Sequence, residues 1–80
     1  MAERIGITPD IETTQWKADK AFKNIRNWKL TEPFKSKKDA KDWEKQKAES
    51  LDCKVFKQEI DTKRIRPVWQ GFYFEHDGPK

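Results

Sequence analysis

Cysteine, histidine and glycine are scarce in this chain, and each shortage excludes a class of site. Among the 80 residues, Cys53 is the one cysteine and His76 the one histidine. An intrachain disulfide is therefore excluded, and these two donors are too few for a tetrahedral zinc site. With three glycines, the sequence contains no glycine-rich loop of the kind that holds phosphates. We therefore expect neither a metal nor a small-molecule cofactor.

Long apolar runs are also missing. No stretch approaches the roughly 18 consecutive apolar residues that a membrane-spanning helix requires. Residues 1–4 lack the hydrophobic region of a secretory signal peptide, and a single cysteine suits a reducing compartment. We therefore expect a cytoplasmic protein that has no membrane partner.

No sequence motif places a catalytic partner beside the residues that could perform catalytic chemistry. His76 lies between Glu75 and Asp77, and a carboxylate beside it could raise its pKa for acid–base work. In an extended strand both neighbours point away from it, which favours a solvated histidine near the chain end. Cys53 alternates with Val55, a pattern typical of a small buried thiol. We therefore expect that the protein is not an enzyme.

Charged and aromatic side chains are abundant. Charged residues make up 40% of the sequence and hydrophobic residues 34%, so each helix or strand offers one apolar face rather than two. The net charge of +4 is unevenly spread, because residues 54–66 hold five cations against Glu59 and Asp61. These cations are Lys54, Lys57, Lys63, Arg64 and Arg66. The last three lead directly into four aromatic residues within residues 69–74.

A helix is predicted near the N-terminus. Thr8 and Pro9 have the order of a helix N-cap followed by proline at the first helical position. Apolar side chains over residues 11–25 then recur at helical spacing. Asp10 and Thr14 are the alternative caps.

A short strand and a second helix follow. Residues 28–32 alternate apolar and polar until Pro33, which is typical of a short edge strand. The segment from Ser36 to Asp39 resembles a capping box, with aspartate in place of the usual glutamate or glutamine. Trp43 lies on the apolar stripe of the helix that begins there, and we expect it to anchor this helix on a sheet.

The predicted architecture is α+β: two helices packed on one face of a small three-stranded antiparallel or mixed sheet, with a C-terminal β-hairpin. The hairpin strands are residues 53–60 and 68–74, joined by a turn at residues 61–67. A chain this short forms one domain. We expect that domain to span residues 1–80, with residues 1–6 and 77–80 loose.

The last strand has two aromatic faces. Phe72 and Phe74 share one face, while Trp69 and Tyr73 lie on the other. If the phenylalanines point at the helices, Trp69 and Tyr73 lie on the open side of the sheet beside Gly71, where a ligand could approach closely.

These patterns favour a small nucleic-acid-binding module. Cations at the hairpin turn would engage phosphates, two rings would stack on bases, and two lysines would extend the basic track. The residues in these roles are Lys63, Arg64 and Arg66, then Trp69 and Tyr73, then Lys54 and Lys57. A solvated turn, whose charges discourage aggregation, and a second minor core under the N-terminal segment are the structural alternatives.

A protein partner is the rival hypothesis. The same residues could form an aromatic and arginine hot spot against an acidic protein surface, or the edge strand before Pro33 could add to a partner's sheet. The protein would then be a non-enzymatic adaptor or inhibitor, of the kind that small phage or mobile-element reading frames encode.

Overall fold

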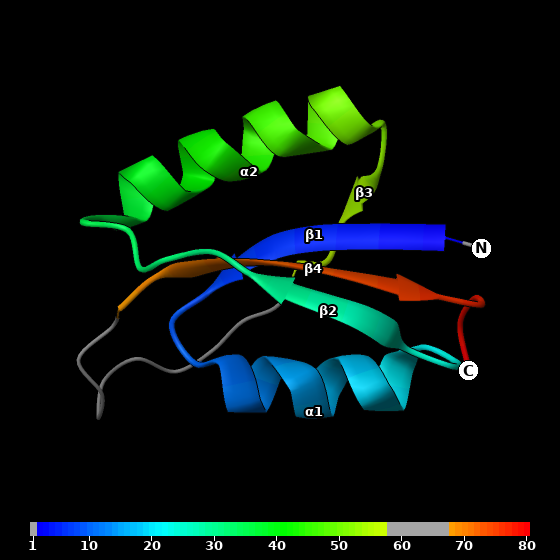
Figure 1. Ribbon diagram of the computed structural model, residues 1–80. Coiled ribbons are helices and arrows are strands. Elements are labelled where there is room, and N and C mark those ends of the chain that lie inside the picture. The colour runs from blue at the N-terminus through cyan, green and yellow to red at the C-terminus, as the bar shows by residue number, and fades with distance from the viewer. Residues whose placement is uncertain (1, 58–67) are drawn as a thin grey trace.

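The computed structural model describes residues 2–57 and 68–80, which form two helices and a four-stranded mixed sheet (Figure 1). In chain order the elements are β1 (Ala2–Thr8), α1 (Ile11–Ala21), β2 (Arg26–Leu30), α2 (Lys37–Leu51), β3 (Lys54–Val55) and β4 (Gln70–His76). The α+β class is as predicted, but the sheet has four strands rather than three. Neither helix has the length and apolar character needed to cross a bilayer, within the described residues.

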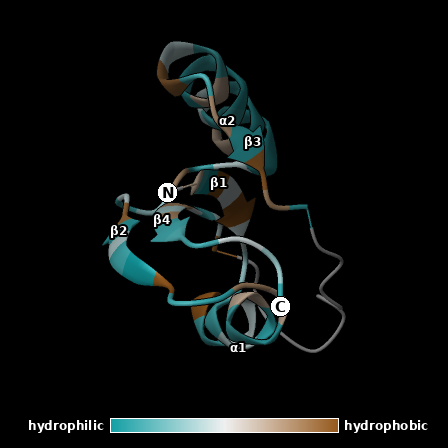
Figure 2. Cartoon of the chain, turned by 90° about the vertical axis from the view of Figure 1, so that its right-hand side faces the viewer, coloured by the Kyte–Doolittle hydropathy of each residue, from teal (hydrophilic) through white to brown (hydrophobic). Residues whose placement is uncertain are grey.

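The two helices lie on opposite faces of the sheet, so the prediction that they share one face was wrong (Figures 1 and 2). The strand order is β2-β4-β1-β3, with β4 antiparallel to β1 and β2, and β3 parallel to β1. The β1–α1–β2 crossover therefore traverses the sheet in one direction, and β2–α2–β3 returns in the other. Since such crossovers are almost always right-handed, reversing direction moves the second helix to the opposite face.

The N-terminal residues form a strand inside the sheet, so the prediction that residues 1–6 are loose was wrong from Ala2 onwards. β1 pairs with β4 along its whole length, and Gly6 lies opposite Phe72. A Cβ atom at Gly6 would lie 2.6 Å from the Phe72 ring, so the glycine is needed where this ring crosses the strand. The partners of this strand lie far away in sequence.

The C-terminal residues are also bound to the rest of the fold, by backbone hydrogen bonds. The backbone N–H of Asp77 donates to the carbonyl of Lys23, and that of Lys80 donates to the carbonyl of Ala21. Residues 77–80, predicted to be loose, therefore attach to the end of α1 and the chain that follows it.

The predicted C-terminal hairpin is not formed as a strand pair. β3 pairs with β1, and β1 separates β3 from β4 in the sheet. The predicted turn at residues 61–67 lies outside the described residues. The sequence suggested a hairpin because the two strands are consecutive, whereas β1 supplies the partner for each of them.

Aromatic rings fill the space between the sheet and α1. Phe72 and Phe74 are fully buried and stack in parallel, 6.1 Å between ring centroids. Phe22, at the end of α1, and Phe56 pack against them. The two strand phenylalanines therefore point at α1, which is the condition under which Trp69 and Tyr73 were expected on the other side of the sheet.

His76 continues this buried face, so the expectation of a solvated histidine was wrong. Its side chain is 1% exposed, and its ring lies 4.2 Å from the Phe22 ring, centroid to centroid. Its Nδ1 accepts a hydrogen bond from the Gly78 backbone N–H at 2.9 Å. Burial, followed by the charge of Arg4, lowers the pKa of His76 below its ordinary value.

Both helices begin at side-chain caps. Asp10 caps α1 by accepting from the backbone N–H of Thr13, so the alternative cap is used rather than Thr8. Ser36 caps α2, as predicted, by accepting from the Asp39 N–H at 3.2 Å. The second cap fixes which side chains of α2 face the functional site.

Candidate functional site

The sequence-predicted site residues fall into three separate pockets rather than one surface. Lys57 and Trp69 line one pocket, Tyr73 lines a second and Lys54 a third. The remaining predicted residues, Lys63, Arg64 and Arg66, lie outside the described residues. The pocket shared by Lys57 and Trp69 is the candidate site and is called the Trp69 pocket below.

The Trp69 pocket has a volume of about 460 Å³ and is lined by separate parts of the chain. α2 contributes charged side chains from its first turns, β1 contributes Ile7, and the chain on either side of residues 58–67 contributes the rest. The lining residues are Ile7, Lys37, Lys41, Glu44, Phe56, Lys57 and Trp69.

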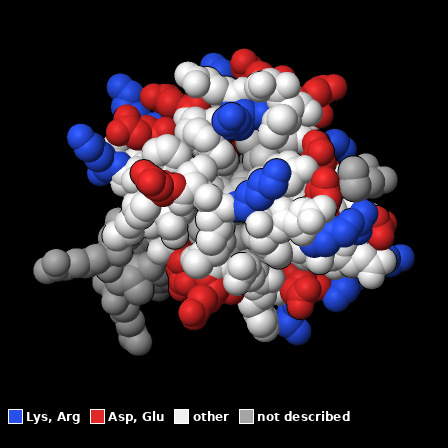
Figure 3. Space-filling model, in the orientation of Figure 1, with Lys and Arg blue, Asp and Glu red and all other residues white. Residues whose placement is uncertain are grey.

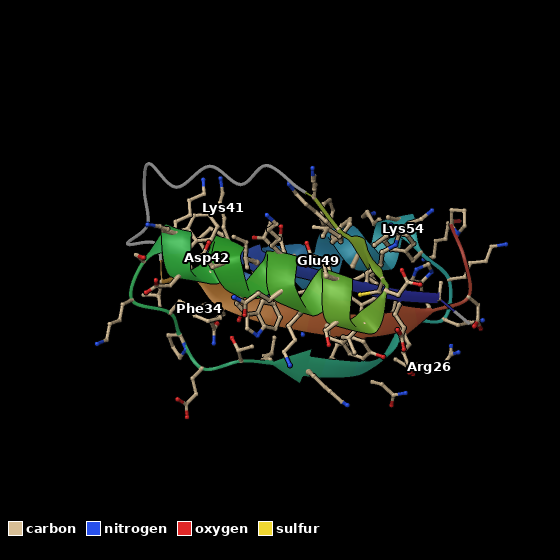
Figure 4. All side chains as sticks on the ribbon, turned by 90° about the horizontal axis from the view of Figure 1, so that it is seen from above. Arg26, Phe34, Lys41, Asp42, Glu49 and Lys54 are labelled. Carbon is tan, nitrogen blue, oxygen red and sulfur yellow. The ribbon has the colours of Figure 1, made fainter. Side chains whose placement is uncertain are left out.

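Helical spacing accounts for the α2 side of the pocket. Lys37, Lys41 and Glu44 stand at i, i+4 and i+7, which places them on one flank of the helix. Figure 4 shows Lys41 extending from the flank that faces away from β2. The Ser36 cap fixes where the helix begins, and hence which lysines reach this pocket.

The Trp69 ring already has a cation beside it. The Lys37 Nζ lies 4.9 Å from the centroid of the indole ring, a cation–π geometry. The carbonyl of Trp69 accepts a hydrogen bond from the Phe34 N–H at 2.7 Å. The backbone that carries the ring is therefore tied to the segment that leads into α2.

The pocket has a net positive charge, since three lysines and one glutamate line it. Burial raises the pKa of Glu44 above its ordinary value, while the charges of Lys57 and Lys41 and the Ile7 amide act in the opposite direction. An ionised Glu44 offsets one of the three positive charges. An excess of positive charge remains for an anionic ligand.

Tyr73 lies elsewhere and is already engaged. Its hydroxyl oxygen lies 2.9 Å from Glu3 and 3.2 Å from Glu75, and its single hydrogen is shared between these two carboxylates. Burial and the two carboxylates raise the pKa of Tyr73 strongly. The Lys29 Nζ lies 5.5 Å from the centroid of its ring. Tyr73 therefore belongs to a different cluster of side chains from Trp69.

The face that carries Tyr73 is covered by α2, so the prediction that this side of the sheet is open was wrong. The Trp43 ring lies over Gly71, where an added Cβ would approach it to 2.5 Å. Trp43 anchors its helix on the sheet as predicted. It also fills the position beside Gly71 where a ligand was expected to approach.

Lys54 is at the far end of the molecule. It lines a pocket of about 300 Å³ whose walls also include Glu3 and Asp52. Figure 4 shows Lys54 and Lys41 towards opposite ends of α2. The adjacent Cys53 is half-buried, and burial raises the pKa of its thiol. Lys54 therefore does not extend a basic track from Trp69.

Two lysines of the pocket, Lys37 and Lys41, were not predicted from sequence. Each is one of many lysines in the chain, and a lysine on a helix is usually solvated. The capping box at Ser36 predicts that both lie on one flank, but the approach of Trp69 to that flank depends on tertiary structure.

Within the described ranges, no three side chains of the His, Cys, Asp or Glu type gather as a metal site.

The chain was compared with protein families, curated proteins and solved structures. No family model, no curated protein and no solved structure matches it. The proposal for its function therefore depends on the geometry and charge of the Trp69 pocket.

Proposed function

We propose that the protein is a non-enzymatic module that binds single-stranded nucleic acid at the Trp69 pocket. One observation carries this proposal: an indole ring and three lysines from separate parts of the chain line the same pocket. Single-strand binders combine aromatic stacking platforms with cations that follow the phosphates. The volume of about 460 Å³ falls within the roughly 300–1,000 Å³ of small-ligand pockets.

Each lining residue has a role in this proposal. In this proposal a base stacks on Trp69, and Lys37, whose Nζ lies over the ring, moves aside to contact a phosphate of the stacked nucleotide. Lys41 and Lys57 contact the neighbouring phosphates. Glu44 disfavours a second phosphate close to it and can accept a hydrogen bond from a base amino group.

The proposal changes the set of residues suggested by the sequence. Lys57 and Trp69 are retained, and Lys37 and Lys41 are added. Tyr73 and Lys54 are left out because they line other pockets. The cations Lys63, Arg64 and Arg66 remain predictions from sequence, since they belong to the segment between Lys57 and Trp69.

An amide chemical-shift titration tests the proposal. Labelled protein is titrated with mixed-sequence single-stranded and duplex oligonucleotides at low and at high salt. We expect shifts that saturate with the single strand, weaken at high salt and include Ile7, Trp69 and the first two turns of α2. Shifts with duplex alone would contradict the single-strand assignment. If nothing moves at low salt, the electrostatic argument fails, and the acidic protein partner becomes the leading hypothesis.

A further inference from the structure

A second surface lies at the opposite flank of α2, where the sheet ends in β2. In the strand order β2-β4-β1-β3, no strand among the described residues pairs with the outer side of β2 (Figure 2). The N–H of Thr31 bonds across to the carbonyl of Gly71 at 3.0 Å. Because bonded pairs alternate along an antiparallel ladder, the N–H and C=O of Leu30 point away from β4. A bulge interrupts β2 between Arg26 and Lys29, so the outer edge can accept another strand from Lys29 onwards.

A groove runs beside this edge. It has a volume of about 250 Å³, and its lining includes Trp43, Lys47 and Leu51 of α2. These three stand at i, i+4 and i+8, so they form one stripe along the helix. The groove lies on the β2 side of α2, whereas Phe56 and Lys57, which follow β3, line the Trp69 pocket. On the sheet side, the lining includes Ile5 and Tyr73.

The groove is open to an approaching side chain. α2 packs mainly over β1, β4 and β3, which leaves its β2 flank free to border the groove. Leu51, on the α2 side of the groove, is 46% exposed. An apolar cavity of about 150 Å³ accommodates benzene, so this groove has room for a large apolar side chain.

The charged side chains that line the groove are both lysines and favour an acidic occupant, whereas Glu3 and Glu75 lie at the Tyr73 hydroxyl. Lys29 of β2 and Lys47 of α2 both line it. Figure 3 shows the face that carries β2, with largely uncharged residues across its middle and separate Lys and Arg side chains over them. A second copy of this chain is a poor occupant, since antiparallel pairing of two β2 strands would bring lysines such as Lys29 of one copy towards those of the other.

We propose that β2 and this groove bind an extended, acidic peptide segment of a partner protein. The segment adds to β2 as a further strand, with backbone hydrogen bonds to Leu30. One apolar side chain of the segment enters the groove between Trp43, Leu51 and Tyr73, and its carboxylates pair with Lys29 and Lys47. This surface is separate from the Trp69 pocket, so the proposal does not depend on nucleic-acid binding.

Selection from a phage-displayed library of random dodecapeptides tests the proposal. We expect the folded protein to enrich peptides in which an apolar residue is flanked by aspartate or glutamate at alternating positions. A labelled synthetic copy of the most enriched peptide then gives the affinity by fluorescence anisotropy. The proposal is overturned if no peptide is enriched, or if the enriched peptides carry no acidic residues.

Charge reversal locates the site. The double variant Lys29→Glu/Lys47→Glu should weaken peptide binding roughly tenfold or more, since it turns two attractions into repulsions. The matched control is Lys20→Glu/Lys45→Glu, which makes the same charge change at exposed positions outside the groove. Equal losses in the two double variants would show a general charge effect and overturn the assignment.

A proline at the strand edge tests the backbone contact. Leu30→Pro removes an N–H that points away from β4 and leaves the ladder to β4 intact, so we expect it to abolish peptide binding. If circular dichroism shows that this variant is unfolded, Leu51→Asp, which places a carboxylate on the exposed rim of the groove, provides the second measurement. Unchanged peptide affinity in a folded variant of either kind would contradict the proposal, as would competition between the peptide and an oligonucleotide.

Discussion

At the scale of single residues, the chain supplies its own control for the Trp69 pocket. Trp69 and Trp16 each have a lysine over the ring, with Nζ to centroid distances of 4.9 Å from Lys37 and 4.8 Å from Lys20. Trp16 is 60% exposed on α1 and lines none of the pockets described above. The two tryptophans therefore share a local environment, and only one of them has lysines from other segments around it.

Trp69→Ala should weaken single-strand binding by roughly 1–3 kcal/mol, the usual contribution of one stacked base. Trp16→Ala should leave the affinity unchanged, because removing an exposed ring takes no surface from the pocket. Fluorescence anisotropy with a labelled single strand measures both variants. Equal affinities in the two variants would exclude Trp69 as the stacking platform.

Gly71 tests the packing of α2 on the sheet. Three atoms of the Trp43 ring would lie 2.5–2.8 Å from an added Cβ, so Gly71→Ala forces the helix or the ring to move. Overpacking of this kind costs about 1–3 kcal/mol of unfolding free energy, which urea unfolding measures. In a Trp43→Leu background the same substitution should cost less, since the side chain is smaller. An equal cost in both backgrounds would show that Trp43 is not the obstacle.

At the scale of elements, α2 organises both binding surfaces. One flank presents Lys37 and Lys41 to the Trp69 pocket, and the other presents Lys47 and Leu51 to the groove beside β2. The register of the helix decides which side chains lie on which flank, and the Ser36 cap fixes where the helix begins. A change at this cap should therefore affect the stability of the protein.

Ser36→Ala should lower the unfolding free energy by about 0.5–2 kcal/mol, because the Asp39 N–H loses its side-chain acceptor. Ser50→Ala is the matched control. This serine is exposed near the C-terminal end of the same helix, and its removal should change the stability by no more than about 0.5 kcal/mol. Thermal or urea unfolding compares the two, and equal effects would contradict the capping role.

Local interactions explain which elements the sequence could predict. The start of α2 was correct because Ser36 and Asp39 are three residues apart, and the faces of β4 were correct because alternation is a property of one strand. β1 was missed because its partner β4 lies at the other end of the chain. The placement of the helices on opposite faces depends on the strand order, which the sequence pattern does not reveal.

In the candidate site too, residues with a local sequence signal could be predicted, whereas residues brought in by tertiary structure could not. Trp69 and Lys57 were identified because they flank a cluster of cations in the sequence. Lys37 and Lys41 were not, because a lysine in a helix is usually solvated and only tertiary structure brings these two to Trp69. Tyr73 was placed on the same face as Trp69, but α2 and the carboxylates of Glu3 and Glu75 engage it separately.

At the scale of the whole molecule, the buried histidine makes stability depend on pH. The folded state lowers the pKa of His76, whereas the unfolded chain takes up the proton near the ordinary value of about 6.5. Below that pH the unfolded state binds more protons than the folded state, so stability decreases as the pH falls. Protonation would also place a hydrogen on Nδ1, which could then no longer accept the Gly78 N–H.

Urea unfolding between pH 7.5 and 5.5 measures this effect. We expect the midpoint to fall with pH in the natural protein and to change less in His76→Phe. The phenylalanine can stack with Phe22 and Phe74 but cannot be protonated, so its loss of the Gly78 hydrogen bond lowers stability equally at every pH. Identical slopes in the two proteins would assign the pH dependence to groups other than His76.

The net charge of +4 attracts nucleic acid to any part of the surface, so salt dependence must separate the pocket from this general attraction. Removing one cation that binds a phosphate of a single strand reduces the slope of log K against log salt by about 0.7. Lys37→Gln and Lys41→Gln should each reduce the slope by about this amount. Lys54→Gln removes the same charge from a different pocket and should leave the slope nearly unchanged. If all three variants reduce the slope equally, the protein binds through its overall charge, and the Trp69 pocket has no special role in phosphate recognition.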